Sequence, residues 1–182
     1  DEMYWKARQE IILRHTGEHP YEISGPDAEK LLQKIFTRDI AKVKTGRCSY
    51  QFACYDDGGM ISDGLLLRLT NDKFWFAQGD GHLFSWYKAH SINLDVEIKD
   101  PNVWVSQIQG PKSLKLLNKI VDESLENKFN YFDWIETSIA YEKVIISRTG
   151  FTNELGWEIY LRPENDSKKI GDLILEKGKE MG

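Results

Sequence analysis

The sequence has little of what marks several large classes of protein. Cysteine occurs twice and proline five times among 182 residues, which excludes a disulfide-rich scaffold and a collagen-like or proline-rich chain. No uninterrupted apolar run approaches the roughly 20 residues that a bilayer-spanning helix needs, and the first residues show no basic, apolar secretory signal. These absences predict a cytoplasmic protein with no membrane partner.

Positive charge is also scarce. The chain has 24 Lys and Arg against 29 Asp and Glu, a formal net charge of -5, and its pI is about 5.4. Binding to nucleic acid or to an anionic membrane needs surplus Lys and Arg. We therefore predict no nucleic-acid partner, although a local basic patch is compatible with this composition.

What the sequence does contain is typical of a folded chain. Hydrophobic residues make up 41% and charged residues 29%, values close to the globular average. The length supports one large domain or two small ones on the prior of roughly 100–200 residues per domain. Because no low-complexity linker or repeat divides the chain, we predict that residues 1–182 are compact throughout.

The cysteines and histidines do not suggest a metal centre. Cys48 and Cys54 lie in one predicted strand, too far apart for a disulfide, and no second Cys/His pair stands at zinc-ligand spacing. The four histidines lack a HExxH pattern. Reduced structural thiols and no metal are the prediction, with a metal or redox pair as the alternative.

Apolar periodicity and turn residues predict the order of the elements. Ser24-Gly25-Pro26-Asp27 opens a helix with its apolar stripe at Ala28, Leu31, Leu32 and Ile35, Asp56-Asp57-Gly58-Gly59 is a hairpin turn, and Asp80 is a candidate helix N-cap. The other predicted helices are 3–13, 80–87, 111–121 and 164–181, and the predicted strands are 21–23, 48–54, 60–69, 73–77, 96–98, 103–109, 135–140, 144–147 and 158–161.

Hairpins mixed with single helices favour an α+β fold, with largely antiparallel sheets that carry helices on one face. No GxGxxG follows a strand and no GxxxxGK[ST] occurs, which disfavours a doubly wound nucleotide-binding fold.

Two carboxylates stand where packing alone does not require them. Asp63 lies inside an apolar strand and precedes Gly64, where the backbone can be approached closely. It is either a structural carboxylate bonded to backbone N–H groups or a group that binds or deprotonates an amine. Glu158, between Trp157 and Ile159, is either solvated or buried, and burial would require a cationic or bidentate donor partner.

Four stretches in this order resemble the aminomethyltransferase family of folate-binding proteins, typified by the T-protein of glycine cleavage. They are EISGPDAEKLLQKIFTRDI from Glu22, GRCSYQFACYDDGGMISDGLLLRL from Gly46, IQGPKSLKLL from Ile108 and SRTGFTNELGWEIY from Ser147. Together they span most of the chain in the family's order. The resemblance implies a folate-binding α+β domain of the aminomethyltransferase type.

The resemblance also implies a chemistry, the transfer of a methyl or aminomethyl group from a small donor to tetrahydrofolate. Glu158 matches the family's pterin-binding glutamate, which can accept the two parallel donors on the pterin edge. Asp63 matches the catalytic aspartate and would orient, or take a proton from, the reacting amine. Tyr50 and Phe151 match positions in the wall of the folate site.

Departures from the T-protein pattern point to particular relatives. Ser62 replaces a second acidic residue, and Gly79 replaces an asparagine. This region looks more like the folate-dependent demethylases and the folate domains of dimethylglycine and sarcosine dehydrogenases. The alternative is a non-catalytic folate-binding module of the iron–sulfur-assembly type, although its Lys-Gly-Cys-Tyr signature is absent. Since family members are about twice this length, with a C-terminal barrel region, the resemblance implies a fragment.

Overall fold

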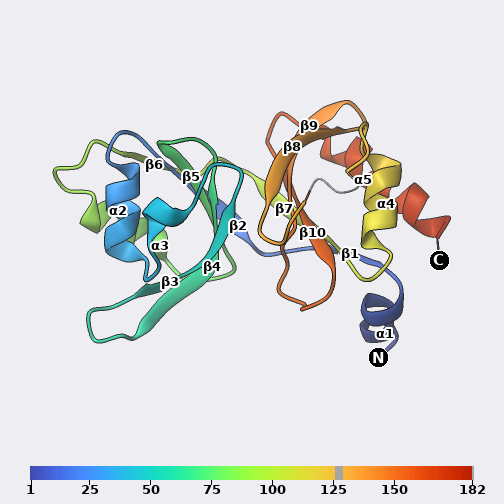
Figure 1. Ribbon diagram of the computed structural model, residues 1–182, viewed down its shortest axis with the longest axis horizontal. Helices are drawn as coiled ribbons and strands as arrows, with labels where there is room; N and C mark the ends of the chain where they lie inside the picture. Colours follow the sequence, from blue (N-terminus) through green and yellow to red (C-terminus); the bar gives the residue numbers. More distant parts are fainter. Residues whose placement is uncertain (126–128, 182) are drawn as a thin grey trace. The chain divides into compact units, whose positions relative to one another are not determined.

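The computed structural model describes residues 1–125 and 129–181 (Figure 1). Their contacts divide the chain into two units, each built around its own five-stranded sheet. Unit 1 comprises Asp1–Thr16 and Trp104–Gly182, and unit 2 comprises Gly17–Val103. The assignment of residues 1–182 to one folate-binding domain stays a prediction.

Unit 2 is an antiparallel sheet with the strand order β3-β4-β5-β2-β6, two α-helices and one short 3-10 helix. The strands are β2 (His19–Ser24), β3 (Cys48–Cys54), β4 (Met60–Arg68), β5 (Lys73–Gln78) and β6 (Glu97–Lys99). The helices are α2 (Ala28–Ile35), α3 (Leu83–His90) and a short 3-10 helix, η1 (Ile40–Lys42).

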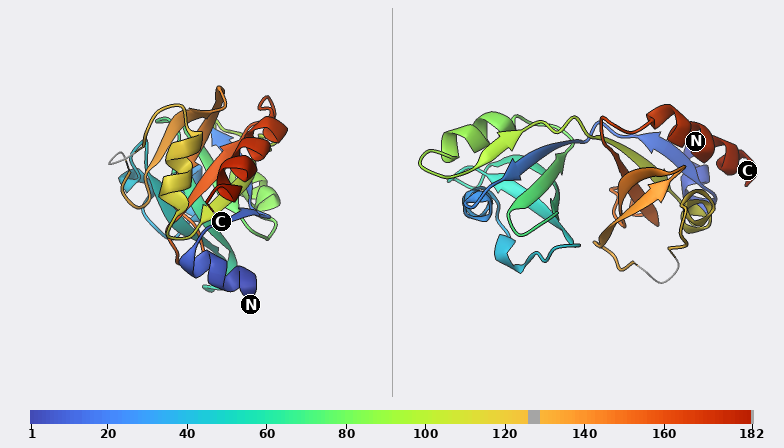
Figure 2. Two further views of the ribbon diagram at one scale, coloured as in Figure 1. Left: turned by 90° about the vertical axis from the view of Figure 1, so that its right-hand side faces the viewer. Right: turned by 90° about the horizontal axis from the view of Figure 1, so that it is seen from above.

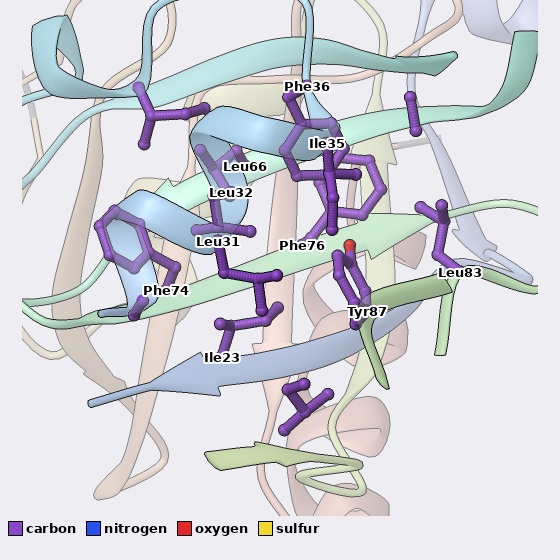
Figure 3. Packing of buried hydrophobic residues seen from close by; sticks show 14 residues of the cluster. Ile23, Leu31, Leu32, Ile35, Phe36, Leu66, Phe74, Phe76, Leu83 and Tyr87 are labelled. Carbon is purple, nitrogen blue, oxygen red and sulfur yellow. The ribbon is translucent and has the colours of Figure 1, made fainter. Parts of the chain in front are cut away.

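The core of unit 2 lies between these helices and one face of the sheet. Figure 3 shows Leu31 and Leu32 from α2 beside Ile23, Phe74 and other residues of the strands. All four residues of the predicted helical stripe are buried, because their spacing places them on one side of α2. Phe36 and Phe76 stack with ring centroids 4.5 Å apart.

Unit 1 is a second antiparallel sheet, with the order β1-β7-β10-β9-β8. Its strands are β1 (Ile12–His15), β7 (Trp104–Gln109), β8 (Trp134–Ile139), β9 (Glu142–Ser147) and β10 (Gly156–Leu161). The helices are α1 (Glu2–Gln9), α4 (Ser113–Ile120) and α5 (Ser167–Lys179). α4 and α5 pack side by side over the sheet (Figure 2), so both units confirm the predicted α+β class with antiparallel sheets.

Two predictions of local structure are wrong. The helix predicted over residues 3–13 ends at Gln9, because Ile12–His15 pairs with β7 as a strand. Asp80 is not the N-cap of α3. Gly81, at a φ of +90°, turns the chain after Asp80, and the N-cap is His82.

The thiols of Cys48 and Cys54 are both free, as predicted. Among residues 1–125 and 129–181, no cluster of His, Cys, Asp and Glu is arranged to hold a metal ion. No described helix is long and apolar enough to cross a membrane.

Gly171 is a point where unit 1 can be stabilised. It lies inside α5, and a Cβ placed there meets no atom within 4 Å. Gly171→Ala is expected to raise the free energy of unfolding by about 1 kcal/mol, because alanine loses less backbone entropy in a helix. Urea denaturation measures the change.

Gly64→Ala is the matched control. Its Cβ would lie 2.3 Å from the backbone oxygen of Ala77 on β5, so a loss of about 3 kcal/mol is expected. If Gly171→Ala gave no gain in stability, the space beside α5 would not be open as described.

Candidate functional site

Glu158 is a buried carboxylate in the middle of the sheet of unit 1. It lies on β10, opposite Gln107 of β7 and Ser147 of β9, and only 4% of its surface is exposed. This register places donors from both neighbouring strands around the carboxylate. Of the two predicted alternatives, a solvated or a buried carboxylate, the structure shows the buried one.

Four neutral donors surround the Glu158 carboxylate. The Gln107 amide donates to Oε1 at 2.7 Å. The hydroxyls of Thr149, Tyr160 and Ser147 donate to Oε2 at 2.6, 3.1 and 3.4 Å. The expectation of a cationic or bidentate partner is therefore not met in the described residues, because several single hydrogen bonds stabilise the buried charge instead.

Burial raises the pKa of the Glu158 carboxyl above its usual value of 4.5, and the hydrogen bonds from Thr149, Tyr160, Gln107 and Ser147 oppose this shift. A carboxyl with a raised pKa holds its proton more tightly in the folded state than in the unfolded state. Its contribution to stability is therefore complete below the usual pKa and is lost as the pH rises through the folded-state pKa.

This direction gives a prediction for stability against pH. The free energy of unfolding of the native protein, measured relative to Glu158→Gln, should fall as the pH rises above the usual carboxyl pKa of 4.5, because only the native side chain must lose a proton. Urea denaturation of both proteins at several pH values measures the difference. A difference that stayed constant, or rose with pH, would contradict the raised pKa.

The loop between β9 and β10 is built around Gln109. The Thr152 hydroxyl donates to Gln109 Oε1 at 2.5 Å. A Cβ at Gly150 or Gly156 would lie 2.8 or 2.1 Å from the Gln109 side chain. Gly150 and Gly156 are thus required because a larger residue would collide with Gln109. Gln109 in turn fixes the loop that carries Thr149 and Phe151.

Phe151 is not part of the cluster around Glu158. Its ring is 59% exposed, and the Arg14 guanidinium lies 4.5 Å from the ring centroid. A cation over an aromatic face is attracted by the ring. The structure therefore places Phe151 on the surface of the loop, and its predicted contact with folate stays a prediction.

Tyr50 and Asp63, which were predicted separately, lie together in unit 2. They occupy adjacent strands, β3 and β4, and the Tyr50 phenol donates a hydrogen bond to Asp63 Oδ2. This bond, with burial, raises the pKa of the Tyr50 phenol. No backbone N–H of the described chain is bonded to the Asp63 carboxylate, and both alternatives, a structural carboxylate and a group that acts on an amine, stay predictions.

The neighbours of Asp63 have structural roles. The Ala77 carbonyl of β5 lies so close to Gly64 that a Cβ there would be 2.3 Å from its oxygen. This close approach explains the glycine after Asp63. Ser62 is buried, and its hydroxyl donates to the Asp80 carbonyl at 2.9 Å. Ser62, where the resemblance to the T-protein leads us to expect a second acidic residue, is thus a buried hydroxyl that is bonded to the backbone at Asp80.

Sequence reasoning missed the residues that hold Glu158. Gln107, Thr149 and Tyr160 come from β7, the loop after β9, and β10. A glutamine or serine at an inward position of an apolar strand is a signal for a buried polar network. Which residues share that network depends on strand register, and the sequence alone does not give it.

Comparison with known proteins places this geometry in context. The family described as "GCVT N-terminal domain" matches residues 7–182. The aminomethyltransferase of Anoxybacillus flavithermus is 35% identical over 177 residues, which cover 93% of this chain and 47% of that protein. The trimethylamine-oxide aldolase of Ruegeria pomeroyi is 33% identical over a 193-residue alignment that covers all of this chain and 24% of that protein.

The fold also matches a solved structure. The glycine cleavage system aminomethyltransferase T from Bartonella henselae aligns with a TM-score of 0.83 at 20% identity, over 96% of this chain and 48% of that one. The chain spans about half the length of the aminomethyltransferases it matches.

Proposed function

The chain belongs to the GCVT N-terminal domain family, and from this membership we propose that it takes part in the transfer of a one-carbon group from a small donor to tetrahydrofolate. The observation that carries the proposal is the preformed, buried carboxylate of Glu158 with its ring of neutral donors. Tetrahydrofolate supplies the nitrogen that receives the one-carbon group. The residues of this chain bind, orient and move protons.

Glu158 is proposed to hold the edge of the pterin. A carboxylate has about four lone-pair sites, two on each oxygen. Oε1 accepts only the Gln107 amide, whereas Oε2 accepts all three hydroxyls. Ser147 and Thr149 also contact each other, with their hydroxyl oxygens 2.5 Å apart, so both can turn away and keep a partner. Glu158 could then accept the pterin N3–H and 2-amino group side by side.

Asp63 is proposed to act on the reacting amine. The phenol of Tyr50 fixes one carboxylate oxygen and leaves the other to accept a proton from the amine or to orient it. Holding the donor in line for transfer supplies much of the rate through positioning. Tyr50 is thus a positioning residue as well as a proposed wall of the folate site.

We propose a small methylated amine as the donor class. The observation that supports it is Ser62, which directly precedes Asp63 and is not a second carboxylate. Its hydroxyl donates to the Asp80 carbonyl. The Ruegeria relative is named a trimethylamine-oxide aldolase, which is compatible with such a substrate. An aminomethyl donor, as in the aminomethyltransferases, is the second candidate, because these relatives have the higher identity.

Anaerobic titration calorimetry tests the proposed folate site. Tetrahydrofolate should bind this chain with one site, and p-aminobenzoylglutamate, which lacks the pterin, should not bind measurably. No binding of tetrahydrofolate by a well-folded chain would overturn the assignment of the pterin site to these residues. Incubation of the tetrahydrofolate complex with methylated amines then separates a transferase from the alternative, a binding module of the iron–sulfur-assembly type, which would show no turnover.

A further inference from the structure

A hollow of about 690 Å³ in unit 2 has cationic side chains at four of its eight lining residues. Arg38, Lys42, Lys44 and Arg47 line it, and Asp39 is the one acidic residue among its lining residues. We call this hollow the basic pocket. A net charge of about three positive units is thus concentrated within ten residues of a chain whose net charge is -5.

The backbone that carries these cations is fixed to the body of unit 2. Gln33 Oε1 accepts the N–H of Ile40 at 2.9 Å, and Gln51 Oε1 accepts the N–H of Arg38 at 3.2 Å. Arg68 Nη1 donates to the carbonyl of Val43 at 3.1 Å. Ile40 and Val43 are also buried. The cations therefore project from a held segment, which lowers the entropy cost of binding a ligand.

Two of the four cations have no acidic partner in the part of the chain that the structure describes. Asp39 lies 3.4 Å from the Lys42 ammonium and also caps η1. Within the described residues, no ion pair joins Arg38 or Lys44 to an acidic side chain. Like charges gathered in this way repel one another unless an anion neutralises them, so the arrangement favours a bound anion over a merely solvated surface.

The basic pocket adjoins the Tyr50–Asp63 pair. Cys48 and Ser49, which line the pocket, directly precede Tyr50 on β3. The positive charge of Arg38 also lowers the pKa of the Tyr50 phenol, against the larger effect of the hydrogen bond to Asp63, which raises it.

We infer that the basic pocket binds a small, multiply charged oxyanion, a ligand separate from the pterin. Arginine recognises carboxylate and phosphate groups through paired N–H donors, and lysine adds point charges. The cations surround one hollow rather than forming a track, which favours a compact ligand over a nucleic-acid backbone. Carboxylate and phosphate share this chemistry, so citrate and pyrophosphate serve as the two probes.

Calorimetry at low ionic strength tests the site without any folate. The native chain should bind citrate or pyrophosphate, and the stronger of the two identifies the group. Arg38→Gln and Lys44→Gln should each weaken binding about tenfold, since each removes a charge-assisted hydrogen bond. Arg38→Lys should retain part of the affinity. Lys30→Gln is the control, because Lys30 lies on α2 outside the pocket and its loss should change binding less than about twofold.

The inference would be overturned if neither anion bound, or if Lys30→Gln weakened binding as much as Arg38→Gln. Thermal melting of each variant separates loss of the site from loss of the fold. Since the titration contains no tetrahydrofolate, its failure leaves the proposed pterin site untouched, and failure of the pterin site leaves this result standing.

Discussion

Glu158→Gln is expected to weaken tetrahydrofolate binding by about two to three orders of magnitude while unit 1 keeps its fold. The carboxylate can accept both donors of the pterin edge, whereas an amide would present its own NH₂ group to one of them. Each hydrogen bond to a charged group is worth roughly 1.5–3 kcal/mol, so the loss of one bond, together with the loss of charge from the other, accounts for the effect. Anaerobic calorimetry with tetrahydrofolate measures it.

Glu158→Ala separates binding from stability. Alanine removes the acceptor that Gln107, Thr149 and Tyr160 share in the interior, and a buried donor that loses its acceptor costs about 1–3 kcal/mol. We expect a loss of about 3 kcal/mol in the free energy of unfolding, against a small change for Glu158→Gln, whose carbonyl keeps one acceptor. If Glu158→Gln bound tetrahydrofolate as tightly as the native chain, the carboxylate would not be the pterin site.

The parts of the fold that could be predicted are those set by local patterns. The apolar stripe of α2 and the Asp-Gly-Gly turn between β3 and β4 each encode one element without help from distant residues. Ile12 and Leu13 were assigned to a helix because a short apolar run fits either structure. Pairing with β7, more than ninety residues along the chain, decides in favour of a strand.

In the candidate site, too, local patterns predict single residues, whereas the contacts between them depend on distant parts of the chain. Asp63 and Glu158 were found because carboxylates in apolar strands are unusual and because the motifs resemble a known family. The bond between Tyr50 and Asp63 requires that β3 and β4 pair in one particular register, and the donors around Glu158 come from three segments of unit 1. The position of Arg38 beside Tyr50 likewise depends on how Gln51 holds the loop.

Asp63→Asn is expected to lower turnover by about two to four orders of magnitude, the usual contribution of a positioned acid or base. Asparagine keeps the shape of aspartate and can still accept the Tyr50 hydrogen bond, but it cannot take a proton from the reacting amine. The dissociation constant of tetrahydrofolate should change less than about threefold. Single-turnover kinetics with a methylated-amine donor and calorimetry on the same preparation measure the two quantities.

Tyr50→Phe distinguishes chemistry from positioning at the same pair. It leaves the Asp63 carboxylate in place and removes its donor, so turnover should fall about tenfold, less than in Asp63→Asn, because the carboxylate is less well oriented. Equal losses of turnover in both variants would mean that Asp63 supports the pairing of β3 with β4 rather than the reaction.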